Sequence, residues 1–429
     1  MKNIYKINRL SLFVVLASWQ VAGYAGGFAI GTQSGSGTGN AFAGGAAVAD
    51  DASVVWSNPA GMTALPMGKH VTGAVHALLP SFKFNNAGSS GAVSCVSPPF
   101  PACPGGEGGD GGGLAFVPNG FFAMDITPAL RFGVALNAPF GLKTEYNLGW
   151  RGQATALVSG IKSINVQPSL AYQVNNFFSI GGGISVQKLD AKLSGFAGAP
   201  GVLELKADDL AFGFNLGVTF QPSSSTRIGA HYRSSIKYNL DGTATFSAAP
   251  IVNGPVWADL KVPDSLSLSL THQATPNLEL MGDATWTGWD SVQQLVVIRN
   301  AAVPGAAAGS TLTTLPFLWK DTWRLGVGAN YRVSAQMKLR FGVAHDQSPT
   351  NDLTRTPRLP DESRTWLAFG LQYKPTKQGA LELAYAHEFV KNASINAPIA
   401  VPPPTPATNL IGSFKNKADI ISVQYSHAF

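Results

Sequence analysis

The chain has 429 residues, of which 30 are Lys or Arg and 24 are Asp or Glu, and charged residues make up 13% of it. Soluble domains usually contain about 25% charged residues and about 7% glycine, so a chain with few charges and 48 glycines is atypical of them. It has no basic run with interleaved aromatic residues, which argues against a nucleic-acid partner.

Residues 1–25 predict a cleaved secretory signal. They begin with Lys2, Lys6 and Arg9, continue with an apolar run at 10–17 that is too short to span a bilayer, and end on small residues at 23 and 25. A short buried helix would not explain the basic flank and the small residues together. We therefore expect the mature chain to begin at Gly26, with 27 basic and 24 acidic side chains.

The glycine-rich segment 26–67 raises the question of a phosphate-binding loop. Its centre reads "GTQSGSGTGNAFAGGAAVADDASVVWSNPAGM" at 31–62. Asn40 takes the place of the third glycine of a dinucleotide fingerprint, and Gly68-Lys69 is followed by His70 where a Walker loop has Ser or Thr. Neither nucleotide motif is complete, so we expect this small-residue segment to pack inside something larger.

Residues 68–429 alternate in the manner of β-strands. In "FGFNLGVTF" (212–220) apolar residues occupy one face and Gly, Asn and Thr the other, and "RLGVGANYRV" (324–333) and "LAFGLQY" (367–373) repeat the pattern. No later segment offers the run of about 20 apolar residues that a membrane helix needs. An exported chain of this kind crosses a membrane as a β-barrel, which pairs every backbone group. The strands of a soluble sandwich also alternate, so the lengths of the connections are needed to distinguish a sandwich from a membrane barrel.

Short and long connections take turns along the chain. This asymmetry is typical of outer-membrane barrels, which have tight periplasmic turns and long external loops. It predicts an all-β fold, a 14-stranded antiparallel transmembrane β-barrel at 68–429, with segment 26–67 as a hatch (plug) inside a lumen too wide for wall side chains to fill. The short turns are at 125–130, 174–177, 221–226, 273–277, 333–336 and 374–379, and the long loops are near 85–112, 142–161, 191–206, 243–256, 299–314, 347–362 and 391–412.

Several individual residues gain a role in this architecture. Asp50 and Asp51 of the hatch are candidates to pair with arginines of the lumen, although a helix N-terminus or plain solvation would explain two acids equally well. The last strand, "ISVQYSHAF", alternates up to Phe429 and resembles the signal that the outer-membrane assembly machinery reads. Cys95 and Cys103 lie in the first long loop, where an oxidising environment favours a disulfide between them.

Enzymatic and metal-binding classes find little support. The seven histidines are scattered, no His-x-x-x-His or Cys/His pair suits a metal, and no Gly-x-Ser-x-Gly elbow occurs between a strand and a helix. We therefore expect no catalytic residues, no metal and no cofactor. An open polar porin would line its lumen with many charges, whereas Gly and uncharged residues dominate the expected inner faces. A purely structural or adhesive barrel is a further alternative.

The stretch "GTGNAFAGGAAVADDASVVWSNPAG" (37–61) resembles the N-terminal hatch of the FadL family of outer-membrane transporters for hydrophobic compounds, including its Ala-Asp-Asp-Ala and Asn-Pro-Ala runs. The resemblance continues through "NAPFGLKTEYN", "LKVPDSLSLSL", "WKDTWRLGVGANYRV" and "RLPDESRTWLAFGLQY", and covers essentially the whole mature chain. It implies an outer-membrane protein surrounded by lipid, with a hydrophobic small-molecule ligand, acting as a monomer.

The resemblance also implies a route. Family members capture a lipophilic molecule between external loops, pass it to an inner pocket beside the hatch and release it sideways at an inward kink of the third strand. Asn58, with Pro59 and Ala60, matches the hatch motif near the kink, and Gly141 matches the kink glycine. The residues agree with this, because Pro139 donates no ladder bond and Gly141 weakens one. The alternative is that Pro139 simply marks the outer end of the strand.

The substrate is less well specified. Fatty-acid transporters of the family hold the carboxylate with basic residues, and Lys320 matches one of them. The other position, an arginine before Phe-Ala-Gly, is Gly195 here, with Lys192 or Lys188 as candidate substitutes. We expect long-chain fatty acids or similar lipophiles, with uncharged aromatic or aliphatic hydrocarbons as the alternative that the missing arginine favours.

Overall fold

The computed structural model describes residues 26–89, 105–198, 201–399 and 408–429. In the described ranges, no helix is long and apolar enough to cross a membrane. The helices are short: α1 (Gly35–Thr38), α2 (Val54–Ser57), η1 (Pro59–Ala64), η2 (Pro250–Val252) and η3 (Trp289–Ser291). The strands are β1 (Lys69–Asn86), β2 (Ala115–Asp125), β3 (Leu130–Asn137), β4 (Gly141–Glu145), β5 (Val158–Gln173), β6 (Phe178–Phe196), β7 (Val202–Ser223), β8 (Thr226–Arg233), β9 (Ile236–Phe246), β10 (Gly254–Val262), β11 (Ser265–Thr275), β12 (Leu278–Thr287), β13 (Gln294–Arg299), β14 (Thr311–Pro316), β15 (Thr322–Arg332), β16 (Met337–Asp346), β17 (Arg364–Tyr373), β18 (Gly379–Val390), β19 (Ala393–Ile399) and β20 (Thr408–Ala428).

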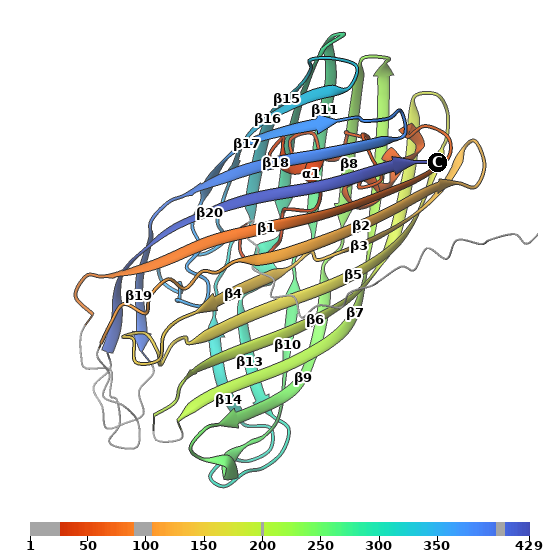
Figure 1. Ribbon diagram of the computed structural model, residues 1–429. Coiled ribbons are helices and arrows are strands. Elements are labelled where there is room, and N and C mark those ends of the chain that lie inside the picture. Colours follow the sequence, from red (N-terminus) through yellow and green to blue (C-terminus); the bar gives the residue numbers. More distant parts are fainter. Residues whose placement is uncertain (1–25, 90–104, 199–200, 400–407) are drawn as a thin grey trace, which may run out of the picture.

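These twenty segments form one closed antiparallel barrel of fourteen wall strands (Figure 1). Six wall strands are interrupted and appear as the pairs β3/β4, β8/β9, β10/β11, β12/β13, β14/β15 and β18/β19, each pair lying along the same neighbouring wall strand. The ring closes because β1 pairs with both β2 and β20. The predicted fold class is confirmed, and each predicted short turn joins two strands of the wall.

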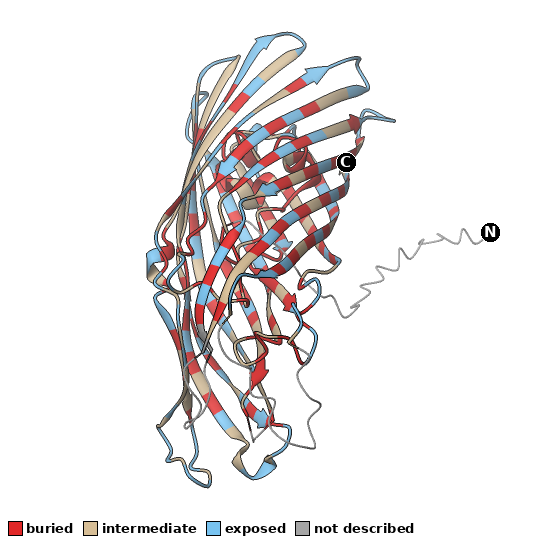
Figure 2. Ribbon diagram, turned by 90° about the vertical axis from the view of Figure 1, so that its left-hand side faces the viewer, coloured by how far each residue is buried: buried red, intermediate tan, exposed pale blue. Residues whose placement is uncertain are grey.

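The two faces of the wall differ as the alternation predicts. On β7, Phe212 and Leu216 are 65% and 57% exposed, whereas Asn215 between them is fully buried. The same striping of buried and exposed residues runs along the other strands (Figure 2). Apolar side chains that face outward suit a lipid environment, where the backbone is already paired in the ladder. We call the end with the short turns the turn end, and the opposite end the loop end.

Residues 26–67 lie inside the ring, and the first wall strand begins at Lys69 (Figure 1). Glycines on the inner face of the wall make this possible. A Cβ added to Gly217 would lie 1.9 Å from the Asn58 side chain, one on Gly229 would lie 1.9 Å from the Ala46 carbonyl, and one on Gly342 would lie 2.0 Å from Asn40. At these three points the N-terminal segment lies so close to the wall that a side chain on the wall residue would overlap it.

Candidate functional site

The third wall strand is broken between Asn137, where β3 ends, and Gly141, where β4 begins. Pro139 lies in the break and has no N–H to donate. Its carbonyl instead accepts a 2.7 Å hydrogen bond from the Ile30 N–H, and the Gly141 N–H donates to the Phe28 carbonyl at 2.9 Å. The start of the N-terminal segment therefore forms a short antiparallel pairing with the broken strand, on the side of the lumen.

The same break separates the third strand from the second. The ladder between β2 and β3 ends at the pair Gly120–Leu136. Among the described residues, backbone hydrogen bonds between these two neighbouring segments resume only where the Glu145 N–H donates to the Gly111 carbonyl at 3.0 Å. The wall thus contains an interval, at 112–119 on one side and 137–144 on the other, in which neighbouring strands are not joined by ladder bonds.

Residues of the N-terminal segment fill this interval from inside. The Gln33 side chain donates to the Ile30 carbonyl at 2.7 Å and to the Ala138 carbonyl at 3.1 Å, and it accepts from the Asn137 amide at 2.6 Å. From the opposite strand, the Asn119 amide donates to the Gln33 carbonyl at 2.8 Å. Residues 28–33, which we call the stopper, join the two sides of the gap. The sequence offered no signal for them.

A cavity of about 250 Å³ lies directly behind the stopper. Its apolar lining includes Phe42, Trp56, Phe140 and Trp366. Its two arginines differ in partners: Arg324 forms a 3.3 Å ion pair with Asp283, whereas Arg233 contacts neutral groups. Arg233 donates to the Gln167 side chain at 2.7 Å and to the Trp56 carbonyl at 2.9 Å, and its guanidinium lies 3.2 Å from the centre of the Trp56 ring. We call this the inner cavity.

A second cavity of about 640 Å³ lies toward the loop end, and we call it the outer cavity. Leu193, Phe196, Leu205 and Phe246 contribute to its apolar lining, and Arg358 is its basic residue. Ligand cavities usually measure about 300–1,000 Å³ and are mostly apolar with a few polar groups. The outer cavity is within this range, and the inner cavity is just below it.

The Asn-Pro-Ala motif anchors the segment to a different part of the wall. Asn58 is fully buried and its amide donates to the carbonyls of Ala46, at 2.7 Å, and Val218, at 3.0 Å. Its side-chain oxygen accepts from the Ala60 N–H at 3.1 Å and so caps η1, with Pro59 at the first position of that helix. Asn58 thus bonds to β7, whereas the contacts with the strand-three break come from the stopper.

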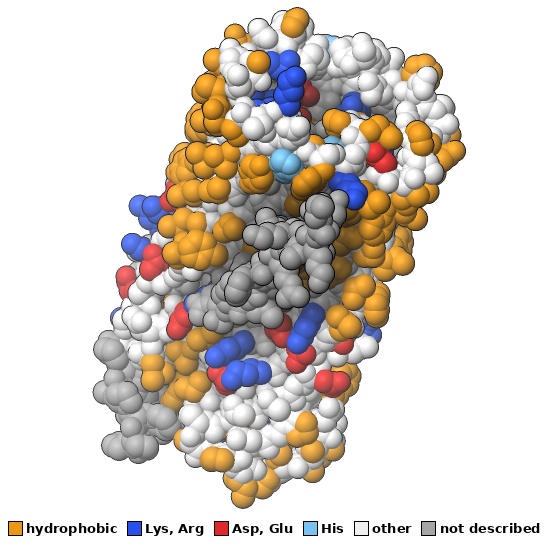
Figure 3. All heavy atoms as spheres, turned by 45° about the vertical axis from the view of Figure 1, so that its right-hand side comes forward, with side chains coloured by type: hydrophobic (Ala, Val, Ile, Leu, Met, Phe, Trp, Pro, Cys, Tyr) orange, Lys and Arg blue, Asp and Glu red, His pale blue; other side chains and the backbone are white. Residues whose placement is uncertain are grey.

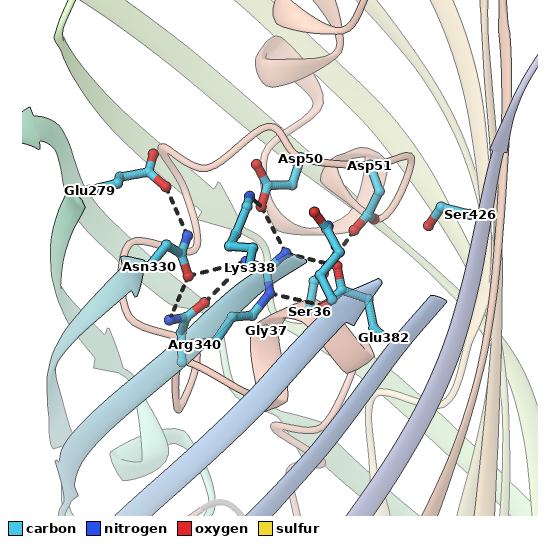
Figure 4. Close-up of polar contacts among 12 residues, drawn as sticks. Ser36, Gly37, Asp50, Asp51, Glu279, Asn330, Lys338, Arg340, Glu382 and Ser426 are labelled. Atoms are coloured by element: carbon cyan, nitrogen blue, oxygen red, sulfur yellow. Dashed lines mark hydrogen bonds and ion pairs between the residues drawn. The ribbon is translucent and has the colours of Figure 1, made fainter. Parts of the chain in front are cut away.

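Asp50 connects the segment to the opposite wall (Figure 4). Its carboxylate lies 3.0 Å from Lys338 Nζ and 2.9 Å from Arg340 Nη2, and Arg340 is also paired with Glu382 at 2.8 Å. Burial raises the pKa of Asp50, but the two cations outweigh burial and lower that pKa below its ordinary value. Asp51 pairs with no arginine among the residues that the structure describes. It accepts hydrogen bonds from Ser36 and Gln424, each at 2.8 Å.

The start of the segment lies beside buried carboxylates. The Gly26 N–H donates to Asp346 at 3.2 Å, and the Gly27 N–H donates to Asp361 at 2.9 Å. Arg364 pairs with Asp361 and with Glu388, whereas Asp346 forms no ion pair with a side chain in the described ranges. All these carboxylates are buried.

The lysines suggested by the sequence lie elsewhere. Ser185, Gln187 and Leu189 of β6 are buried, so Lys188 and Lys192 are on the outer face, where Lys188 bridges Asp190 and Asp208 at 3.4 and 3.2 Å and Lys192 pairs with Glu204 at 2.8 Å. Figure 3 shows charged side chains gathered on the wall beyond its apolar belt. Lys320 is exposed and lines neither cavity. Arg233 and Arg358, which line the cavities, were missed.

Two further expectations concern the cysteines and a metal site. Cys95 and Cys103 lie outside the described residues. Within the described ranges, no group of three or more His, Cys, Asp or Glu side chains is placed to hold a metal ion.

A family model described as "Outer membrane protein transport protein (OMPP1/FadL/TodX)" matches residues 14–429. The chain belongs to this family. The members are transporters and channels rather than enzymes, and they are outer-membrane proteins. The resemblance seen in the sequence is therefore confirmed.

Relatives within the FadL/TodX family differ in what their names state. The "Long-chain fatty acid transport protein" of Escherichia coli K12 is 25% identical over 442 residues, covering 92% of this chain and 94% of its own. The crystal structure of a Pseudomonas aeruginosa FadL homologue has a TM-score of 0.84 at 25% identity and covers 94% of this chain and 100% of its own. The Pseudomonas putida toluene transporter TodX has a TM-score of 0.65 at 15% identity, covers 91% and 98%, and supports the fold alone.

Proposed function

We propose that this FadL/TodX family member takes up long-chain fatty acids or similar lipophilic molecules by lateral diffusion through the barrel wall. The ligand enters the outer cavity, moves to the inner cavity and leaves through the interval between β2 and the broken third strand. The observation that carries this proposal is the stopper, because residues 28–33 occupy an interval of the wall that lacks ladder bonds and border the inner cavity.

A lateral exit suits a lipophilic solute. Each Å² of apolar surface that stays out of water is worth about 25 cal/mol, so a route from an apolar cavity directly into lipid avoids the cost of an aqueous channel. Pro139 and Phe140 line the inner cavity and belong to the break, and a ligand there is adjacent to the interval once the stopper moves. A polar porin conducts solutes through a water-filled lumen and does not require an opening in the wall toward the lipid.

Cleavage of the signal after Ala25 is part of the proposal. A buried carboxylate is stabilised by a nearby positive charge. If the mature chain begins at Gly26, its α-amino group carries that charge 3.2 Å from Asp346. The new N-terminus then fixes the stopper a few residues before the break. Recognition of Phe429 by the assembly machinery, and a monomeric state, remain predictions.

The stopper is testable with a reversible cross-link. Ala29 and Phe140 form an isolated antiparallel bridge flanked by the Ile30–Pro139 and Phe28–Gly141 hydrogen bonds. Such non-hydrogen-bonded pairs have Cα atoms about 4.5 Å apart, which suits a disulfide. In the double variant Ala29→Cys/Phe140→Cys, uptake of radiolabelled palmitate is expected to stop on oxidation and to recover with reductant.

Each single cysteine variant, and the unsubstituted protein treated with oxidant and reductant, serve as controls, because Cys95 and Cys103 respond to the same reagents. Full uptake by the oxidised double variant would exclude movement of the stopper away from the break.

The choice between fatty acids and hydrocarbons needs a direct binding measurement. Purified protein in detergent is titrated with radiolabelled palmitate and, in parallel, with toluene. The presence of Arg233 in the inner cavity without a carboxylate partner in the described ranges favours an anionic ligand. Saturable palmitate binding supports the fatty-acid proposal, saturable toluene binding alone supports the hydrocarbon alternative, and the absence of both refutes transport by this route.

A further inference from the structure

Arg358 enters the barrel on the long connection between β16 and β17 and is held there by its own backbone. The Pro357 carbonyl accepts a 2.8 Å hydrogen bond from the Tyr146 hydroxyl, and the Arg358 carbonyl accepts a 3.0 Å bond from Thr144. Both donors come from the third wall strand and the loop that follows it. These bonds fix the point from which the Arg358 side chain extends into the outer cavity.

Within the described ranges, the guanidinium of Arg358 has no carboxylate partner. One nitrogen, Nη1, donates to the Ser159 hydroxyl and the Ser194 carbonyl, each at 3.1 Å. Nε is buried and has no hydrogen-bond partner, and no ion pair joins Arg358 to an acidic residue in the described part of the chain. Burial lowers the pKa of Arg358 to about 10, so the group is still cationic at neutral pH. Arg358 is only partly buried, but a cation held inside the barrel without a counter-ion is still costly, and an anion that enters the cavity lowers that cost.

The neighbours of Arg358 indicate what kind of anion fits. Gly195 and Arg358 both line the outer cavity, and a Cβ added to Gly195 would lie 3.4 Å from Arg358 Nη2, so a side chain at 195 would contact the guanidinium. Beyond it, the lining is apolar and includes Leu193, Phe196 and Phe246. A carboxylate at the guanidinium with an acyl chain along the apolar lining satisfies both parts of the cavity. Nη1 already donates to Ser159 and Ser194 and Nε is buried, so Nη2 is the nitrogen that can donate a charge-assisted hydrogen bond to such a carboxylate.

We propose that Arg358 is the headgroup anchor of the outer cavity and makes this protein select monoanionic amphiphiles, fatty carboxylates, over uncharged lipophiles of equal length. The proposal rests on the proposed function and names its substrate class. It assigns the anchor to a residue far in sequence from Gly195, the position that appeared to lack one. The competing role is a structural one, in which Arg358 only ties its loop to Ser159 and Ser194.

Binding of two ligands of equal chain length separates these roles. Equilibrium binding of radiolabelled palmitate and hexadecanol is measured at pH 8 for the unsubstituted protein, Arg358→Gln and Arg358→Lys. Loss of a charge-assisted interaction is expected to weaken palmitate binding to Arg358→Gln by about 10- to 100-fold, with hexadecanol changed less than about threefold. Arg358→Lys keeps the charge and should recover part of the palmitate affinity. Lys237→Gln, an exposed residue paired with Asp259 on the outer face, is the control.

A second pair of variants keeps Arg358 in place. Gly195→Asp puts a carboxylate beside the guanidinium, and Gly195→Asn has the same shape without the charge; an added Cβ lies 3.1 Å from the Ala154 carbonyl in both. Gly195→Asp should weaken palmitate binding at least tenfold relative to Gly195→Asn, with equal hexadecanol binding. Equal losses for both ligands, or unchanged palmitate binding in Arg358→Gln, would overturn the anchor. Absence of saturable binding of either ligand to the unsubstituted protein would instead overturn the proposed function.

Discussion

Replacement of Asp346 by Asn tests whether the α-amino group of Gly26 holds the stopper in place. Asp346 is 4% exposed, accepts from Gly26 at 3.2 Å and forms no side-chain ion pair in the described ranges. A hydrogen bond to a charged group is worth about 1.5–3 kcal/mol. Because Asp361 still accepts from Gly27 at 2.9 Å, we expect one such bond to be lost, about 2 kcal/mol, which is about a 30-fold shift toward the released stopper.

The shift toward the released stopper can be measured as the hydrogen-exchange rate of two backbone amides. The Ile30 and Gly141 N–H groups bond across the stopper and the strand-three break, so both are protected only while the stopper is seated. In Asp346→Asn their exchange should be about 30-fold faster, and amides of the β1–β20 ladder should be unchanged. Asp259→Asn, an exposed aspartate of the outer wall, is the control. Unchanged exchange at Ile30 and Gly141, or an intact mass that does not begin at Gly26, would refute the reasoning.

Two predictions concern Asp50. Asp50→Asn removes the ion pairs with Lys338 and Arg340 but leaves Arg340 paired with Glu382, so exchange of hatch amides such as Val48 should rise by about tenfold without a change in barrel melting temperature. The pKa of Asp50 is lowered on folding, so the stability that it contributes is present above the unfolded pKa and is lost as pH falls through the still lower folded pKa. Protection of the same amides should therefore be constant between about pH 8 and pH 5, and a loss of protection on acidification within that range would contradict the Asp50 assignment.

The sequence predicted the wall better than the contents of the lumen, for a physical reason. Outward apolar residues and inward Gly or Asn recur every second residue, so strands such as 212–220 and 324–333 can be recognised from the local sequence, without knowledge of the strand they pair with. The break at 138–140 was predicted from Pro139 together with Gly141; a proline alone does not decide it, because Pro80 and Pro118 lie inside the continuous strands β1 and β2. Pro263 likewise lies at the interruption between β10 and β11.

The residues that were missed depend on contacts between distant parts of the chain. Arg358 reaches the space beside Gly195 from a loop that is more than 150 residues away, so no local pattern connects the two. The role of the stopper likewise depends on its hydrogen bonds to Pro139 and Asn119, which lie about 90 or more residues further along the chain. The sequence pointed to lysines near the matched family positions, but in β6 the period of two places Lys188 and Lys192 on the outer face.

Some wall glycines are in direct contact with the N-terminal segment, and one pair of variants tests whether they are needed to seat it. A Cβ on Gly217 would lie 1.9 Å from the Asn58 side-chain oxygen, and Asn58 is fully buried with hydrogen bonds to Ala46, Val218 and Ala60. Gly217→Ala therefore forces Asn58 to move or lose bonds. Overpacking costs about 1–3 kcal/mol, and each unsatisfied buried group about as much again.

The matched control is Gly73→Ala on the outer face of β1, where an added Cβ meets nothing within 4 Å. Both substitutions remove one glycine from a wall strand, so any effect through the unfolded chain is shared. Gly217→Ala should raise exchange of the Asn58 and Gly61 amides by tenfold or more, as about 1.4 kcal/mol requires, and Gly73→Ala should leave them unchanged. If both variants behave alike, Gly217 is not needed to seat the N-terminal segment.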